Sequence, residues 1–370
     1  MSRPERLIVH LHLCVLTLVG LLLVGTTARA GNDMPSVDYA AINKALIEDH
    51  VIVRYGALAD AAEIFATTVK GFCTEGAGSE EKLADARAAY QGLTDAWAGV
   101  AHIRFGPVEL LMRGARFYFW PQGRGRIAAA LTDLMASADR QIITRERFRF
   151  ASVAAQGLPA AAFLLYPDAA EQPRMDRCLL LPVIADNLEE IAAGLLSDWR
   201  DGANGFARVA MTPGPDNDYF DSHAEVTLSF LKALHTGLQS IADIELKPVL
   251  RDPQLAFLPP AGRELRTMRI TLAALAEIYL GTEDGRGISD LVEQRGVDPA
   301  LDPLMRKAFR MTRETADTIA LPLPRAVRDK TEREKVEKLL TQITALRQIV
   351  ERRLARAVDL QIGFNALDGD

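Results

Sequence analysis

The residues best suited to metal chemistry are scattered through this sequence. Outside the first thirty residues the chain has four histidines, at His50, His102, His223 and His235. Metal sites need imidazole and carboxylate groups brought together, often by a spacing such as H-E-x-x-H. None of the four histidines belongs to such a pattern, so the sequence predicts neither a metal site nor a cofactor at these positions.

One acid-rich stretch, "DNDYFDSHAE", is the densest set of oxygen ligands in the chain. It contains Asp216, Asp218, Asp221, His223 and Glu225. Such a set could hold a hard cation loosely. We favour a second interpretation, in which a solvated loop leads into a helix capped by Asp221 or its neighbour Ser222.

Nucleophilic catalysis is not indicated, because the sequence has no G-x-S-x-G motif. Only Cys73 and Cys178 lie outside the first thirty residues. In an exported chain an even cysteine count favours a disulfide over two buried thiols. We therefore predict that Cys73 and Cys178 are linked.

The stretch "RFGPVELLMRGARFYFWPQGRGR" combines five arginines with five aromatic residues. Stacking on nucleic-acid bases is one interpretation, but the chain has a net charge of −6, which repels phosphate backbones. The alternative is an irregular connection between helices, braced by arginines that stack on rings or pair with carboxylates. We favour that alternative and expect no nucleic-acid partner.

Residues 1–30 have the features of a secretory signal peptide. Arg3 and Arg6 precede the apolar run "LCVLTLVGLLLVG", which ends in "TTARA". A basic start, a short apolar run and an A-x-A end predict cleavage after Ala30. An uncleaved membrane anchor is the alternative, but it usually needs about 20 apolar residues. We expect a periplasmic or cell-envelope protein with no membrane span in the mature chain.

Helical periodicity dominates the rest of the chain. Apolar residues recur every three or four positions in "SEEKLADARAAYQGLTDAWAGV", with Ser79 as the expected N-cap. No alternating strands or hairpin signals occur. The sequence predicts an all-α fold with one bundle over 35–205 and another over 215–362, separated by the Gly- and Pro-rich stretch "RDGANGFARVAMTPGPDNDYFD".

Several motifs together resemble the imelysin-like family of bacterial envelope proteins, in particular its iron-regulated periplasmic branch. They are "HIRFGP", "RFYFWPQGRGR", "QGLPAAAFLLY", "NLEEIAAGLLSDW" and the terminal "IGFNALDGD". The resemblance covers about 40–370. It implies two antiparallel four-helix-type bundles related by duplication, export to the envelope, and a link to iron acquisition.

The family's G-x-H-x-x-E motif, whose His and Glu are presumed metal ligands or catalytic groups, is altered here. The matching segment begins at Gly157, with Pro159 in the histidine position and Ala162 in the glutamate position. Neither side chain can bind a metal. We therefore expect no metal at this motif, and an enzymatic role is not favoured.

The resemblance also suggests where a ligand binds. We expect the tail 363–370 to pack on the bundles, with Asp368 near Arg104, and we expect Arg113 or Arg124 to line a cleft between the bundles. The candidate binding residues are Arg104, Arg113, Arg116, Trp120, Arg124, Gln156, Gly157, Asn365 and Asp368.

The sequence leaves three functions open. The first is an envelope protein that binds an unidentified ligand or protein partner, linked to iron or haem acquisition and its components. The second is a metal-dependent peptidase, and the third is a structural interaction module. We favour the first, because the catalytic positions of the family motif are replaced.

Overall fold

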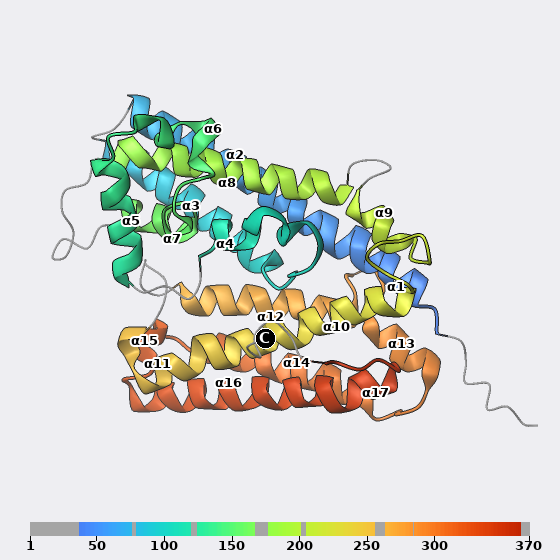
Figure 1. Ribbon diagram of the computed structural model, residues 1–370. Coiled ribbons are helices and arrows are strands. Elements are labelled where there is room, and N and C mark those ends of the chain that lie inside the picture. Colours follow the sequence, from blue (N-terminus) through green and yellow to red (C-terminus); the bar gives the residue numbers. More distant parts are fainter. Residues whose placement is uncertain are drawn as a thin grey trace, which may run out of the picture. The chain divides into compact units, whose positions relative to one another are not determined.

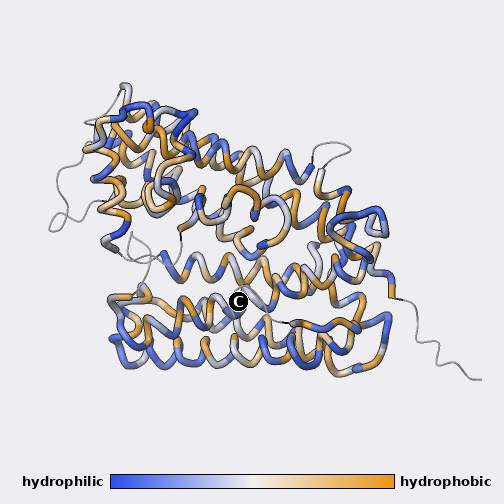
Figure 2. Tube along the Cα trace, viewed as in Figure 1, coloured by the Kyte–Doolittle hydropathy of each residue, from blue (hydrophilic) through white to orange (hydrophobic). Residues whose placement is uncertain are grey.

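The apolar stripes of the sequence form the buried faces of long helices. A computed structural model describes residues 37–75, 79–119, 124–166, 177–200, 205–255, 263–283 and 285–363. Throughout these ranges the regular elements are helical, as predicted (Figure 1). Figure 2 shows hydrophobic and hydrophilic residues alternating along the helices, as an amphipathic pattern requires.

One group of helices comes from the N-terminal half. Helix α2 packs against both α3 and α8, and the short α7 contacts α3 and α8. The predicted stripe of α3, from Leu83 to Val100, is buried, and the Ser79 hydroxyl caps the helix by accepting from the Lys82 N–H at 3.2 Å. The four helices are α2 (Val53–Glu75), α3 (Glu80–Val100), α7 (Leu158–Leu165) and α8 (Arg177–Arg200).

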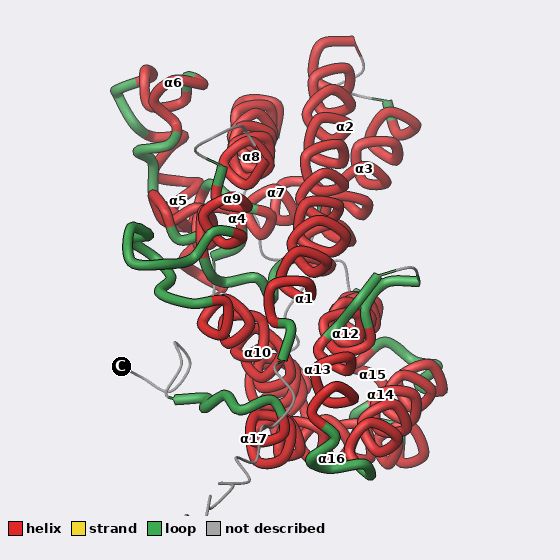
Figure 3. Tube along the Cα trace, turned by 90° about the vertical axis from the view of Figure 1, so that its right-hand side faces the viewer, coloured by secondary structure: helices red, strands yellow, loops and turns green. Residues whose placement is uncertain are grey.

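A second group comes from the C-terminal half. Helix α12 contacts α10 and α14, and α16 contacts α14 and α10, so the four helices enclose a common core. Helix α3 packs on α12 and thereby joins the two groups, which Figure 3 views from the side. The four helices are α10 (His223–Gln239), α12 (Glu264–Leu280), α14 (Leu301–Thr318) and α16 (Lys330–Ile349).

Shorter helices complete the described chain. They include α1 (Tyr39–Ala45), α4 (Arg113–Phe117), α5 (Arg124–Ala136), α6 (Arg145–Phe148), α9 (Phe206–Met211), α11 (Lys247–Arg251), α13 (Ile288–Arg295), α15 (Leu323–Ala326) and α17 (Ala355–Ala357). Single 3₁₀ turns are η2 (Gly106–Val108), η3 (Leu110–Met112), η4 (Arg140–Ile143), η5 (Val153–Ala155) and η8 (Pro253–Leu255). Wider π-helical turns interrupt three long helices, at η1 (Leu46–Ile52), η7 (Ser240–Leu246) and η9 (Val350–Leu354).

The Gly- and Pro-rich stretch expected to separate two bundles contains an ordered helix, α9. Its Phe206 ring packs on Trp199 of α8, with ring centroids 5.0 Å apart, and on Phe220, 6.0 Å away. These aromatic contacts tie the stretch to α8, and α9 also contacts α1 and α10. Residues Pro35–Asp370 cluster as one compact unit, and the division into two domains between 205 and 215 stays a prediction.

The cysteine pair lies at disulfide-bonding distance, as predicted. The Cys73 and Cys178 sulfurs are 2.06 Å apart, and the two residues are separated by 105 positions in sequence. Cys73 is in the last turn of α2 and Cys178 in the first turn of α8. The bond therefore fastens the ends of two helices that already pack along their length.

None of the helices in the described residues is long and apolar enough to cross a membrane. The predicted signal peptide, residues 1–30, lies outside the described residues.

Candidate functional site

The arginine-rich stretch forms an irregular connection between α3 and α5. Gly106 has φ +74°, and a Cβ there would lie 2.6 Å from the Phe206 ring, so this turn requires glycine. Further along, Leu111 and Met112 adopt left-handed backbone angles, with φ 54° and 55°, although neither is a glycine. Such strained positions concentrate at functional sites.

Two arginines of this connection brace it against α8. The Arg113 Nη1 lies 2.5 Å from Asp198 Oδ2, and the guanidinium lies beside Gly194 of α8. The Arg116 guanidinium donates to Gln156 Oε1 and to Asn187 Oδ1, each at 2.8 Å. These contacts fit the predicted arginine-braced connection.

A cavity of about 600 Å³ lies beside this connection, where the two groups of helices meet. Its wall comes from the end of α3, the connection 101–118, the end of α10 with η7, helices α11 and α12, and the start of α15. Most of the wall is apolar. The apolar side chains are those of Trp97, Ala98, Ala101, Ile103, Val108, Met112, Ala115, Ile244, Val249, Met268 and Leu323.

Four charged residues of the described ranges line this cavity, and two of them, Arg104 and Glu245, come from different elements and lack partners there. Arg104 belongs to the connection and Glu245 to the π-helical turn η7. The Glu245 side chain is half-buried, whereas Arg104 has much protein around it but remains exposed to solvent. Within the described part of the chain, neither forms a hydrogen bond or an ion pair.

The carboxyl of Glu245 holds its proton unusually well. Burial raises the pKa of Glu245 to about 7; the Arg104 guanidinium opposes the rise, and the Glu264 carboxylate adds to it. Burial lowers the pKa of Arg104, but a guanidinium remains protonated in proteins. Near neutral pH the pair therefore presents a cation and a carboxyl that is partly protonated.

A buried pair of histidines adjoins the cavity, and one member of the pair, His102, lines it. The Nε2 atoms of His50 and His102 are 2.9 Å apart, and His50 Nδ1 lies 3.2 Å from Glu277 Oε2. Burial lowers the pKa of both imidazoles, that of His102 well below its usual value. His102 lines the cavity as a neutral side chain held by His50.

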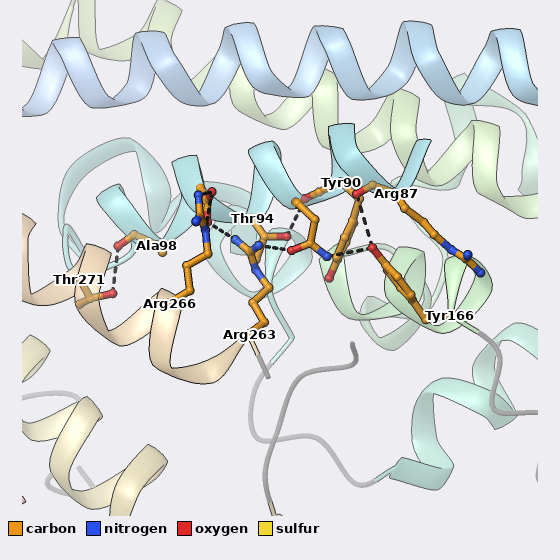
Figure 4. Close-up of polar contacts among 10 residues, drawn as sticks. Arg87, Tyr90, Thr94, Ala98, Tyr166, Arg263, Arg266 and Thr271 are labelled. Atoms are coloured by element: carbon orange, nitrogen blue, oxygen red, sulfur yellow. Dashed lines mark hydrogen bonds and ion pairs between the residues drawn. The ribbon is translucent and has the colours of Figure 1, made fainter. Parts of the chain in front are cut away.

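Polar contacts between α3 and α12 fix one side of the cavity (Figure 4). The Arg263 guanidinium donates to Gln91 and Asp95, and Arg266 Nη2 reaches Asp95 Oδ2 at 2.6 Å. One turn further along, the Thr271 hydroxyl donates to the Ala98 carbonyl at 3.1 Å. Because Ala98 and Thr271 both line the cavity, this network sets the spacing of that wall.

The altered family motif lies at the start of α7 and away from the cavity wall. A Cβ at Gly157 would be 2.5 Å from the Phe117 carbonyl oxygen, so the close approach of α7 to α4 requires glycine. Pro159 and Ala162 are buried. A metal does not fit this segment, because neither residue carries a ligand atom.

The remaining acidic and imidazole groups do not assemble into a metal site in the described ranges, where no three of them could share an ion. In the stretch "DNDYFDSHAE", the Asn217 side chain organises the turn by accepting from the N–H groups of Tyr219 and Phe220. Ser222 occupies the N-cap position of α10. The predicted loop leading into a helix after Ser222 is confirmed, although the Ser222 hydroxyl adds no capping hydrogen bond.

We predicted specific roles for some arginines of this connection. We expected Arg104 to pair with Asp368 and Arg113 or Arg124 to line a cleft. Arg113 pairs with Asp198, and Arg104 lines the cavity. Asp368 and the side chain of Arg124 lie outside the described residues, so their parts of the expectation stay predictions.

Three other predicted residues do not line the cavity. Arg116 donates to Gln156, and Gly157 lies against the backbone of Arg116 and Phe117.

Three predicted residues, Trp120, Asn365 and Asp368, lie outside the described residues, and so does the side chain of Arg124. The predicted packing of the tail 364–370 falls outside them as well.

Sequence reasoning missed Glu245, although a signal for it exists. Leu234, Leu238, Ile241, Glu245 and Val249 follow one another at helical spacing, so a carboxyl stands in the apolar stripe of this segment. An acid on a buried stripe is rarely without a role. Its position in a π-helical turn is a second sign, since such turns are frequent at functional sites.

Comparisons with known proteins identify the family. The model of the imelysin family, peptidase M75, matches residues 51–350. The chain therefore belongs to the imelysin family. A search of curated proteins found no match.

Two solved structures share the fold. An imelysin-like protein from Psychrobacter arcticum 273-4 is 17% identical, with a TM-score of 0.71 over 89% of this chain and 99% of that chain. An iron-regulated protein A precursor from Parabacteroides distasonis ATCC 8503 is 14% identical, with a TM-score of 0.70 over 86% of this chain and 96% of that chain. At these identities the likeness concerns the fold alone.

Proposed function

We propose that this protein is an exported binding protein of the imelysin family that holds a small ligand in the cavity between α3, the connection 101–118, η7 and α12. The observation that carries the proposal is the cavity itself, with a volume of about 600 Å³. Small-molecule sites typically enclose about 300–1,000 Å³ between apolar walls, with a few polar groups that orient the ligand. The wall described above has that composition.

The rigidity of the wall supports the same function. Binding is strongest when a site is preorganised, because little conformational freedom is then lost. Here α3 and α12 are joined by Arg263, Arg266 and Thr271, and the connection is held on α8 by Arg113 and Arg116. A ligand would enter a site whose sides are already in place.

We further propose that the protein works in the cell envelope within iron or haem acquisition. The signal-peptide features of residues 1–30 support export. The family membership and the name of the Parabacteroides neighbour, an iron-regulated protein A precursor, support the link to iron.

Filling the cavity tests the binding function. Ala101 lines the cavity at the end of α3, whereas Ala88 lies on the exposed side of the same helix. The fluorescent probe 1-anilinonaphthalene-8-sulfonate should bind the purified protein, and Ala101→Phe should weaken that binding at least tenfold. Ala88→Phe is the matched control and should leave the Kd unchanged. Equal binding by both variants would contradict the proposal.

The link to iron needs a separate measurement. The amount of this protein in the cell envelope should rise several-fold when the source cells are depleted of iron, as measured by quantitative mass spectrometry. An unchanged amount would remove iron acquisition from the proposal and leave ligand binding untouched.

A further inference from the structure

The cavity contains two ionisable side chains that the fold leaves without partners. Among the described residues, Arg104 and Glu245 form no hydrogen bond or ion pair. On the same wall the buried Thr267 hydroxyl and His102 Nδ1 also lack a hydrogen-bond partner within the described ranges, whereas two other hydroxyls are satisfied. The Thr94 hydroxyl donates to the Tyr90 carbonyl at 2.9 Å, and Thr271 donates to Ala98. Arg104 is exposed to solvent but has much protein around it, so its guanidinium loses part of its hydration, which a bound anion can replace. Arg104 and Glu245 are therefore the groups that a ligand would contact.

The two groups lie close enough to influence each other, yet they do not form a salt bridge. Each appears among the causes of the other's pKa shift, but no ion pair joins them. Glu264 also faces the cavity, from α12, but it is engaged in an interaction of its own. Within the described chain, Arg104 and Glu245 therefore place one unmatched permanent cation beside one unmatched carboxyl that retains its proton.

The rest of the wall is suited to an apolar molecular body. Trp97 and Ile103 come from α3 and the residues after it, Ile244 from η7, and Met268 from α12, so apolar side chains reach the cavity from both groups of helices. Burial of apolar surface there contributes about 25 cal/mol per Å². A ligand that fits both parts of the cavity is amphipathic.

We propose that the cavity binds an amphipathic carboxylate, whose apolar body packs between α3, η7 and α12 and whose carboxylate accepts hydrogen bonds from the Arg104 guanidinium and the protonated Glu245 carboxyl. The inference rests on the proposed binding function and names its ligand class. A carboxylate satisfies both unmatched groups at once and neutralises the cation. A cationic ligand would require ionised Glu245 and would leave Arg104 unpaired.

The proposal implies that binding is coupled to a proton. A second negative charge beside Glu245 favours its protonated form, so the complex retains a proton that the free protein loses through about pH 7. Affinity should therefore rise as the pH falls from 8.5 to 6.

Other groups on the wall do not replace Glu245 in this role. The pKa of His102 lies well below its usual value, and that of Tyr118 well above it, chiefly because both are buried. Neither changes charge between pH 6 and 8.5. The other carboxyls on the wall are those of Glu264 and the exposed Glu109. A variant at Glu245 separates the effect of Glu245 on the pH dependence from the effects of these two.

Three ligands with one ring system and different charge test the proposal. The probes are 2-naphthylacetate, 2-naphthylacetamide and 2-(2-naphthyl)ethylamine, titrated calorimetrically into the mature protein. At pH 6.5 the carboxylate should bind at least tenfold more tightly than the amide, and the amine should bind most weakly. Arg104→Gln should reduce carboxylate affinity to that of the amide. The control Arg313→Gln changes an exposed arginine on α14 and should have no effect.

The pH profile gives an independent reading. Between pH 8.5 and 6.5 the carboxylate affinity of the wild-type protein should increase about tenfold. Glu245→Gln should keep tight binding at both pH values, because its amide still donates a hydrogen bond and does not titrate.

The possible results separate this inference from the proposed function. If all three probes bind equally and Ala101→Phe weakens them all, the cavity binds ligands but the carboxylate preference is wrong. If the amine binds most tightly and Glu245→Gln removes that binding, the carboxylate preference is also wrong and the cavity prefers a cation. If none of the probes binds to the wild-type protein at millimolar concentration, both the inference and the proposed function fail.

Discussion

At the scale of single residues, the cavity combines an unmatched arginine with an acid on a buried stripe. Glu245 costs stability when it ionises, because burial raises its pKa from 4.5 to about 7. Between these values the unfolded chain has lost the proton that the folded protein keeps. The free energy of unfolding therefore falls as the pH rises through this window, and the full penalty is present above it.

Removing the charge should remove the penalty. At pH 8 we expect Glu245→Gln to be more stable than the wild-type protein by roughly 2 kcal/mol, since one pKa unit corresponds to about 1.4 kcal/mol and water in the cavity reduces the effect. At pH 4.5 the two proteins should be equally stable. Urea unfolding at both pH values measures this, with Glu109→Gln as the control from the exposed part of the same wall. A difference that does not change with pH would contradict the assignment.

At the scale of elements, the long helices and an irregular connection between them were predictable, but the directions of the arginines in that connection were not. The stripe of α3 and its Ser79 cap follow from spacing and local hydrogen bonding, which depend on nearby residues alone. Arg104 and Arg113 extend from an irregular connection that contains two left-handed residues, and such a backbone has no periodic signature from which their directions could be predicted. The cavity likewise needs residues from four segments, so its existence could not be predicted from any one of them.

The link between α2 and α8 gives a prediction at this scale. Closing a loop of 105 residues stabilises a fold by about 5 kcal/mol in the chain-entropy model. The double variant Cys73→Ser/Cys178→Ser should lose roughly that free energy of unfolding, and a reductant should then have no further effect on it. Mass mapping of the wild-type protein should find one linked peptide pair. Two alkylatable thiols in the native, oxidised protein would contradict the predicted disulfide.

At the scale of the whole molecule, two groups of helices meet along α3 and α12 and leave a cavity beside that contact. The family is shown by the match over residues 51–350, but its metal motif has no ligand atoms at Pro159 and Ala162. Among the described residues, the cavity has the size and apolar wall of a small-molecule site. Its wall draws on both halves of the sequence, so ligand binding would also hold the two groups of helices together.

A crystal structure with 2-naphthylacetate at saturating concentration tests ligand binding in this cavity most directly. Electron density for the naphthalene ring should lie between Trp97, Ile244 and Met268, with the carboxylate within hydrogen-bonding distance of Arg104 and Glu245. A fully occupied probe at another place on the protein, with only water between α3 and η7, would contradict the account.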